Sequence, residues 1–214
     1  MDGLGRPKET HTWCDLSLAG RWFNGEAKIR GENMRKACCL MLITLLGAST
    51  LPAATLNDVT LPDSAKVGAE TLVLNGLGLR SKMGAKVYVA GLYLGQKSSD
   101  GPAILKADAA KRLVLHFVRE VGGEKLKDTF LDGFDANAQA TLKAQIDQFT
   151  SALETLKVGE EMAITYVPGT GTAINVKGKD KGTIPGLPFA QAVFGIWLGA
   201  KPPSGDLKKG LLGQ

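Results

Sequence analysis

The sequence predicts an α+β fold, in which an antiparallel sheet carries helices on one face. Segments with the two-residue periodicity of strands are joined by short turns that contain glycine, as in hairpins. A separate block between them has apolar residues at the helical spacings of three and four. Strands and helices that occupy separate blocks of a chain are typical of α+β domains. A hydrophobic content of 44% over 214 residues is enough for a core and argues against a disordered chain.

The first two predicted strands form a hairpin. Residues 71–80 make a strand interrupted by glycines, and residues 85–94 make a second strand rich in Val, Tyr and Leu. The polar segment 81–84 between them contains a glycine and has the length of a hairpin turn. Residues 98–102 then form a predicted loop. Alternating apolar residues predict a third strand over residues 111–118.

Helical periodicity follows the Gly122–Gly123 break. Apolar residues recur every four positions and then at spacings of four and three, which predicts helices with one apolar stripe facing a core, the later one over residues 142–156. The residues of these stripes are Leu126, Phe130, Phe134, Leu142, Ile146, Phe149, Leu153 and Leu156.

The last third of the chain returns to strands and ends in helical segments. Its predicted elements are a strand at 161–167, a hairpin turn at 168–171, the return strand at 172–177, a polar turn at 177–182, a helix that begins at Pro188, and a short segment at 207–212. Because no linker or repeat interrupts residues 55–214, we predict one domain there.

Residues 34–54 have the pattern of a secretory signal peptide. A short positive segment precedes an apolar run of about a dozen residues, and small residues follow it. The run is shorter than the roughly 20 residues of a membrane-spanning helix. We therefore predict cleavage after Ala53 or Ala54 and a periplasmic or secreted protein. Residues 1–33 are interpreted as an upstream extension, either disordered or the product of a misassigned start. In the alternative interpretation there is no signal peptide: residues 1–33 are a genuine disordered tail, and the apolar run that follows is a buried core helix.

Cleavage there leaves a domain with few reactive side chains. The upstream part holds all three cysteines, seven of the 26 basic residues and five of the 21 acidic residues, so 19 basic and 16 acidic residues remain, a net charge of +3. His116, on a predicted strand, is the only histidine left. These counts exclude most zinc sites and Ser-His-Asp triads, and we predict no metal and no cofactor. Without a dense basic block, we also predict no nucleic-acid partner.

Two glycine-rich or lysine-rich patterns carry weaker signals. Gly76-x-Gly78 is a fragment of a dinucleotide fingerprint, but a strand follows where that fingerprint needs a helix N-terminus. Lys177, Lys179 and Lys181 form a cluster in a predicted turn. We interpret the cluster as a solvated turn, with anionic lipid headgroups as an alternative partner.

The segments 74–80 and 86–94 read Leu-Asn-Gly-Leu-Gly-Leu-Arg and Lys-Val-Tyr-Val-Ala-Gly-Leu-Tyr-Leu. They resemble the chalcone isomerase family, in which a glycine-rich strand ends in Arg and the next strand ends in Gly-x-Tyr-Leu. The resemblance continues in matching order through residues 111–117, the helical block and residues 191–199, and looks closest to bacterial, exported members. It implies an open-faced β-sandwich, a large antiparallel sheet layered with helices.

The resemblance also implies where the catalytic groups of the plant isomerases, which close a flavanone ring from a chalcone, would fall. Arg80 matches their arginine, which would polarise the carbonyl if this chain is an isomerase. Tyr88 stands at the position of a threonine, Leu126 at that of a tyrosine, Gly133 at that of an asparagine and Ile196 at that of a Ser/Thr. Because cyclisation needs polar groups that hold the ketone and the attacking oxygen, we predict that chalcone cyclisation is lost.

Arg80 and Tyr88 together resemble the non-catalytic, fatty-acid-binding branch of the family, which pairs an Arg with a Tyr. In a hairpin that turns near Gly84, the two residues lie opposite or diagonal on neighbouring strands. A guanidinium offers a carboxylate two parallel hydrogen bonds, and a tyrosine hydroxyl adds a third. Leu126 and Ile196 would line an apolar wall behind this head. We therefore predict that Arg80 and Tyr88 bind a small amphipathic carboxylic acid, such as a fatty acid.

Two other functions and one other arrangement of the pair stay open. In the first alternative, the domain is an isomerase, an intramolecular lyase that acts on a chalcone-like or other enone, with Arg80 as its catalytic residue. In the second alternative, it is a structural or interaction protein of the envelope with a vestigial cleft. The pair itself has a plain structural interpretation, in which Arg80 binds a surface carboxylate and Tyr88 only packs in the sheet. Binding is excluded if Arg80 and Tyr88 point to opposite faces.

Overall fold

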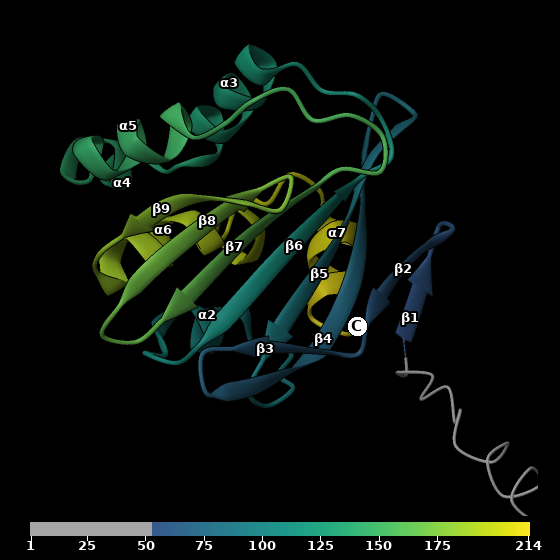
Figure 1. Ribbon diagram of the computed structural model, residues 1–214, viewed down its shortest axis with the longest axis horizontal. Helices are drawn as coiled ribbons and strands as arrows, with labels where there is room; N and C mark the ends of the chain where they lie inside the picture. Colours follow the sequence, from purple (N-terminus) through teal and green to yellow (C-terminus); the bar gives the residue numbers. More distant parts are fainter. Residues whose placement is uncertain (1–52) are drawn as a thin grey trace, which may run out of the picture. The chain divides into compact units, whose positions relative to one another are not determined.

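The computed structural model describes residues 53–214, and a curled sheet of seven antiparallel strands organises them (Figure 1). Each strand pairs with its neighbours in the sequence, so the order in the sheet is the order along the chain. The strands are β3 (Ser64–Val67), β4 (Glu70–Lys82), β5 (Ala85–Leu94), β6 (Lys111–Phe117), β7 (Glu161–Val167), β8 (Gly171–Val176) and β9 (Lys179–Ile184). The predicted hairpin of β4 and β5 and the predicted strands β6, β7 and β8 are confirmed.

The helices lie on one face of this sheet, as predicted for an α+β fold. In Figure 1, α6 and α7 lie behind the strands, and α3, α4 and α5 form a layer along one side of the sheet. Their apolar residues share one core with alternate residues of β5 to β9, including Phe130, Phe149 and Trp197. The helices are α2 (Gly101–Lys106), α3 (Gly123–Gly133), α4 (Ala136–Thr141), α5 (Lys143–Ser151), α6 (Leu187–Leu198) and α7 (Gly205–Leu211).

A short hairpin covers part of the opposite face of the sheet. Its strands are β1 (Ala53–Leu56) and β2 (Val59–Pro62), and Val59 and Leu61 pack in a second apolar cluster on this face. No prediction was made for these strands, because four residues are too few to show a two-residue period. The first two residues of β1 are also the last two of the predicted signal peptide. Its remaining residues and the predicted extension 1–33 lie outside the described part of the chain.

Three predicted elements differ from the structure. Residues 98–102 are not all loop, because α2 begins at Gly101 and the Asp100 carboxylate caps it by accepting from the Ala103 N–H at 3.0 Å. The helix predicted over 142–156 ends at Ser151, and its last apolar residues pack from an irregular segment. The polar turn predicted over 177–182 is mostly strand β9, which is exposed on nearly every residue and therefore shows no apolar period.

Glycines in β4 let α7 lie directly on the sheet. A Cβ atom at Gly76 would stand 2.1 Å from the carbonyl oxygen of Gly210, and one at Gly78 would stand 2.4 Å from that of Leu207. The Gly-x-Gly pattern therefore marks close packing between a strand and a helix. This agrees with the interpretation that Gly76-x-Gly78 is not part of a dinucleotide-binding fingerprint. Among the helices of residues 53–214, none is long and apolar enough to cross a membrane.

Candidate functional site

Arg80 and Tyr88 are direct cross-strand partners in the hairpin of β4 and β5. Both point to the face that carries the helices. Gly78, two residues before Arg80, lies against α7, and the Tyr88 ring packs against the core beneath the helices. The structure therefore brings the two predicted ligand-binding residues together on one face, and the opposite-face arrangement that would exclude binding does not occur.

Arg80 is held by backbone oxygens rather than by a carboxylate. Its Nη1 donates to the carbonyl oxygen of Pro203 at 2.6 Å and to that of Ser81 at 2.9 Å. Within residues 53–214 no Asp or Glu forms an ion pair with Arg80, which contradicts the alternative of a surface salt bridge. Because both bonds use Nη1, the Nη2 and Nε donors have no hydrogen-bond partner in the part of the chain described, and the residue lines the cavity. The guanidinium is thus oriented by the fold and still able to bind an anion.

Tyr88 is a neutral hydrogen-bond donor. Its hydroxyl oxygen accepts from the indole Nε1 of Trp197 at 3.0 Å, so its own O–H is available to donate. Burial raises the pKa of Tyr88 to about 12, although the Trp197 hydrogen bond and the Arg80 charge both lower it. The ring also contacts Phe117, with centroids 5.6 Å apart. Tyr88 therefore keeps its proton at neutral pH and offers it to an acceptor.

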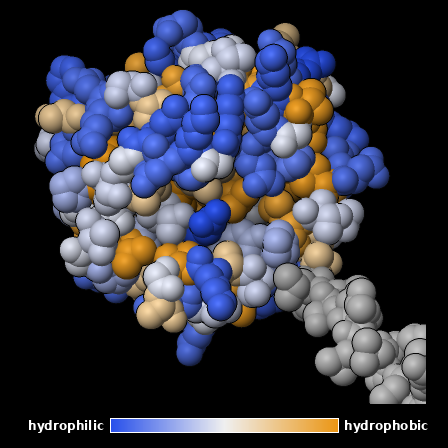
Figure 2. Space-filling model, in the orientation of Figure 1, coloured by the Kyte–Doolittle hydropathy of each residue, from blue (hydrophilic) through white to orange (hydrophobic). Residues whose placement is uncertain are grey.

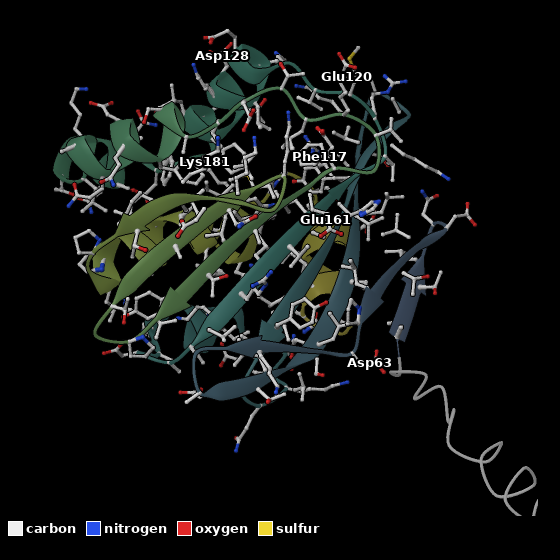
Figure 3. All side chains as sticks on the ribbon, in the orientation of Figure 1. Asp63, Phe117, Glu120, Asp128, Glu161 and Lys181 are labelled. Atoms are coloured by element: carbon white, nitrogen blue, oxygen red, sulfur yellow. The ribbon has the colours of Figure 1, made fainter. Side chains whose placement is uncertain are left out.

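A cavity of about 660 Å³ opens beside this pair. Its walls come from the ends of β4, β5 and β6, from α3, and from the last turns of α6. Figure 3 shows Phe117 at the end of β6, on the side of the sheet toward α3, with Glu120 in the loop that follows. The apolar lining residues are Val87, Phe117, Val121, Leu126, Phe130, Ile196 and Trp197.

The positions singled out by resemblance all line this cavity. Leu126 lies on α3, Gly133 at its end, and Ile196 on α6. A Cβ atom at Gly133 would stand 2.9 Å from Cγ2 of Ile196, so an asparagine side chain has no room beside that isoleucine. The two replacements are therefore sterically coupled, and together with Leu126 they make this part of the wall apolar.

Four exposed cations surround the mouth of the cavity. Lys82, Arg119, Lys125 and Lys201 line it, against the two carboxylates of Glu120 and Asp132. Hydrophilic side chains also cover much of the surface over α3 to α5, with hydrophobic patches below (Figure 2). No sequence pattern pointed to this cluster, because its members lie on separate segments. Trp197 was predicted only as part of an apolar helix stripe, whereas its indole N–H positions Tyr88.

His116 lies away from this site. It is on β6, on the face opposite the helices, where its Nδ1 stands 2.9 Å from Oε1 of Glu161 (Figure 3). Both groups are partly exposed, so this contact is a surface interaction worth about 1 kcal/mol or less. The described residues contain no cluster of three or more His, Cys, Asp or Glu side chains able to hold a metal ion.

Comparison with known proteins gives one family and one similar fold. The model of a family described as chalcone isomerase-like matches residues 53–213. The crystal structure of a fatty-acid binding protein of Arabidopsis thaliana, AtFAP1, superposes with a TM-score of 0.63 at 15% sequence identity, covering 75% of this chain and 96% of that one. At this identity the similarity shows the fold. No curated protein sequence matches the chain.

Proposed function

This chain belongs to the chalcone isomerase-like family, and from that premise we propose that its cavity binds a small amphipathic carboxylic acid, such as a fatty acid, without converting it. The observation that carries the proposal is the Arg80–Tyr88 pair at one side of a cavity with largely apolar walls. One charged anchor beside an apolar wall matches the two parts of such a ligand.

The chemistry of the pair suits a carboxylate. The free Nη2 and Nε donors of Arg80 bind one or both carboxylate oxygens, and the Tyr88 hydroxyl donates a further hydrogen bond. Backbone oxygens of Pro203 and Ser81 hold the guanidinium in place before the ligand arrives. Trp197 does the same for the Tyr88 oxygen. Because the donors are already oriented, little conformational entropy is lost on binding.

The walls accept an alkyl chain. A cavity of about 660 Å³ lies within the range of roughly 300–1,000 Å³ that is usual for small-molecule sites. Leu126 and Phe130 of α3 and Ile196 and Trp197 of α6 form part of its lining, with the Phe130 and Trp197 rings in edge-to-face contact at 5.6 Å, and all four are at most 4% exposed. The similar fold of AtFAP1, a fatty-acid binding protein by name, supports the same class of ligand.

Two observations favour binding over turnover. Tyr88, with a pKa of about 12, stays protonated and cannot serve as a base at neutral pH. The positions at which the resemblance implies a tyrosine, an asparagine and a Ser/Thr are Leu126, Gly133 and Ile196. A cyclase would lack the groups that hold an enone in attack geometry. The isomerase alternative therefore depends on Arg80 alone.

Native mass spectrometry of protein purified from its producing cells tests the proposal. We expect a co-purified acid on the wild-type chain and its loss from Arg80→Ala, because the carboxylate anchor is gone. Lys97→Ala is the matched control, since Lys97 is exposed and follows the far end of β5. An acid retained by Arg80→Ala, or turnover of a chalcone by the wild-type protein, would overturn the proposal.

We also propose that the protein is bacterial and exported, with residues 34–54 as its signal peptide. The support is the sequence pattern of a positive segment, an apolar run and small residues. N-terminal sequencing of the protein from an envelope fraction should start at Ala54 or Thr55. A protein that keeps residues 34–54, or that stays in the cytoplasm, would contradict this part.

A further inference from the structure

The tip of the hairpin of β4 and β5 exposes an apolar side chain where a polar residue is expected. Met83 is 98% exposed and lines the mouth of the cavity. Its φ of 52° is followed by a φ of 78° at Gly84, so the two residues form a turn with both backbones in the left-handed region. Asn, Asp and Gly adopt this conformation most readily. A methionine there is disfavoured by the backbone and by solvent alike, so packing does not explain it.

Exposed cations line the same cavity as this side chain and outnumber the carboxylates there. Lys82 precedes Met83, and Arg119, Lys125 and Lys201 are further lining residues, against Glu120 and Asp132. In residues 53–214 none of the four forms an ion pair with an Asp or Glu. In the cluster Lys177, Lys179 and Lys181, which the sequence suggested for lipid headgroups, Lys177 and Lys181 both pair with Glu154.

We propose that this end of the molecule docks on an anionic phospholipid bilayer. Met83 inserts among the acyl chains, and Lys82, Arg119, Lys125 and Lys201 bind lipid phosphates. An apolar side chain inside a ring of flexible cations complements a bilayer surface, whose charge is diffuse and whose interior is apolar. A protein partner would instead be recognised by a shaped patch with several rigid apolar or aromatic anchors. Here one flexible methionine is the anchor.

The docking places the mouth of the cavity on the membrane. If the cavity binds an acid as proposed above, the ligand passes between the bilayer and the cavity without its alkyl chain crossing water. This last step rests on the proposed function. The docking itself does not, because it needs only Met83 and the four cations.

Tryptophan fluorescence on vesicles with brominated acyl chains tests the insertion. Met83→Trp should show a blue-shifted emission that bromolipid quenches on phosphatidylglycerol-rich vesicles. Lys97→Trp, beyond the other end of β5, is the matched control and should show neither change. The wild-type chain, with Trp13, Trp22 and Trp197, supplies the background for both variants. Equal quenching at positions 83 and 97, or none at 83, would overturn the proposal.

Vesicle binding of charge variants tests the cations. Lys82→Ala/Lys201→Ala should weaken binding to phosphatidylglycerol vesicles about 25-fold, since one cation near an anionic surface contributes about fivefold. Lys97→Ala/Lys106→Ala removes the same charge from the opposite end of β5 and from α2, and should change binding less than about twofold. All variants keep the full chain, so the apolar run of residues 37–48 contributes equally. Similar losses of vesicle affinity in the two double variants would refute the proposal that this end of the molecule docks specifically.

A final variant separates docking from folding and from ligand binding. Met83→Asn suits the left-handed turn, so the free energy of unfolding should stay the same or rise, while vesicle binding falls. Acid binding by this variant in vesicle-free solution should equal that of the wild type. Loss of vesicle binding with acid binding retained supports docking alone. If the wild-type protein binds no acid but still binds vesicles, the proposed function is wrong and the docking proposal is unaffected.

Discussion

Two cation–tyrosine pairs, one buried and one partly buried, lie toward opposite ends of the sheet, and only the partly buried pair is left able to bind something else. At the end away from the cavity, Lys111 of β6 is 1% exposed, and its Nζ donates to the carbonyl oxygens of Ile104 and Ala107 at 2.8 Å each. The same Nζ stands 5.5 Å from the centre of the Tyr166 ring. At the cavity end, Arg80 and Tyr88 sit beside open space.

The difference lies in how completely the protein satisfies each pair. The two carbonyls that Lys111 binds close the end of α2, and the Tyr166 hydroxyl donates to Asp108 at 2.6 Å. In the other pair, Arg80 uses one nitrogen, and Tyr88 accepts a hydrogen bond but donates none within the described residues. A cation with its donors used stabilises the fold, whereas oriented donors without partners, next to a cavity, constitute a binding site.

The sharpest test compares the two cations by mutation. Lys111→Met should lower the free energy of unfolding by about 3 kcal/mol, because it leaves the buried carbonyl of Ile104 and the part-buried carbonyl of Ala107 without the ammonium at the end of α2. Arg80→Met should lower it by less than about 1 kcal/mol, since Arg80 is half-buried and its partners can turn to water. Urea denaturation measures both. Equal losses from the two variants would show that the Arg80 site is structural as well.

Alkaline pH tests the tyrosines of both pairs. Burial raises the pKa of Tyr88 to about 12, and the hydrogen bond to Asp108 raises that of Tyr166 to about 12. A raised pKa means that the fold favours the neutral form, so the stabilisation is complete below pH 10 and disappears as the pH rises to 12. For Tyr88 this amounts to roughly 3 kcal/mol.

Absorbance at 295 nm, followed with pH, reports the ionisation of the tyrosines. Adding a fatty acid should raise the apparent pKa of Tyr88 further, because a carboxylate accepting its O–H disfavours the phenolate. Tyr166 and Tyr93, whose pKa burial also raises to about 12, should titrate as before, and their Phe variants identify their shares of the signal. A ligand that shifts Tyr166 rather than Tyr88 would place the binding site at the wrong end of the sheet.

The smallest expected effect comes from removing single hydroxyls. Tyr88→Phe should weaken fatty-acid binding about fivefold, the value of one hydrogen bond of about 1 kcal/mol. Tyr166→Phe should leave the affinity unchanged, although it loses its bond to Asp108. Isothermal titration calorimetry measures both affinities. An unchanged affinity in Tyr88→Phe would show that Arg80 binds the carboxylate without the Tyr88 hydroxyl.

The predictability of the site followed the range of its contacts. The hairpin of β4 and β5 was predictable from its turn, but the partner of Arg80 was not. Next to the turn Ser81 pairs with Lys86, and a β-bulge between Arg80 and Ser81 then shifts the register and brings Arg80 opposite Tyr88. The hydrogen bonds from Trp197 to Tyr88 and from Arg80 to Pro203 were not predictable either, because they join residues more than 100 positions apart. The four cations that line the cavity come from separate segments, which no local pattern brings together.

The fold shows the same division. Long apolar patterns predicted β4 to β8, α3 and α6, because such periods arise from one buried face. Strand β9 escaped detection because almost all of its residues are exposed, and α2 because six residues show less than two turns of a stripe. The ends of β4 and β5 were predictable from the local sequence. The positions of the helices that pack near them were not, because those positions depend on tertiary packing.

The sequence by itself determined the α+β class and the hairpin that carries Arg80 and Tyr88, since both follow from local periodicity and turn geometry. Only the tertiary structure decided the bulge that makes Arg80 and Tyr88 direct partners, and that Arg80 bonds through one nitrogen beside a cavity while Lys111 binds two backbone carbonyls. It also decided that Leu126 and Ile196 meet around one cavity and that cations from four segments surround Met83. Local patterns specify which face a side chain takes, whereas its partners depend on which distant backbone the packing brings within a few ångströms.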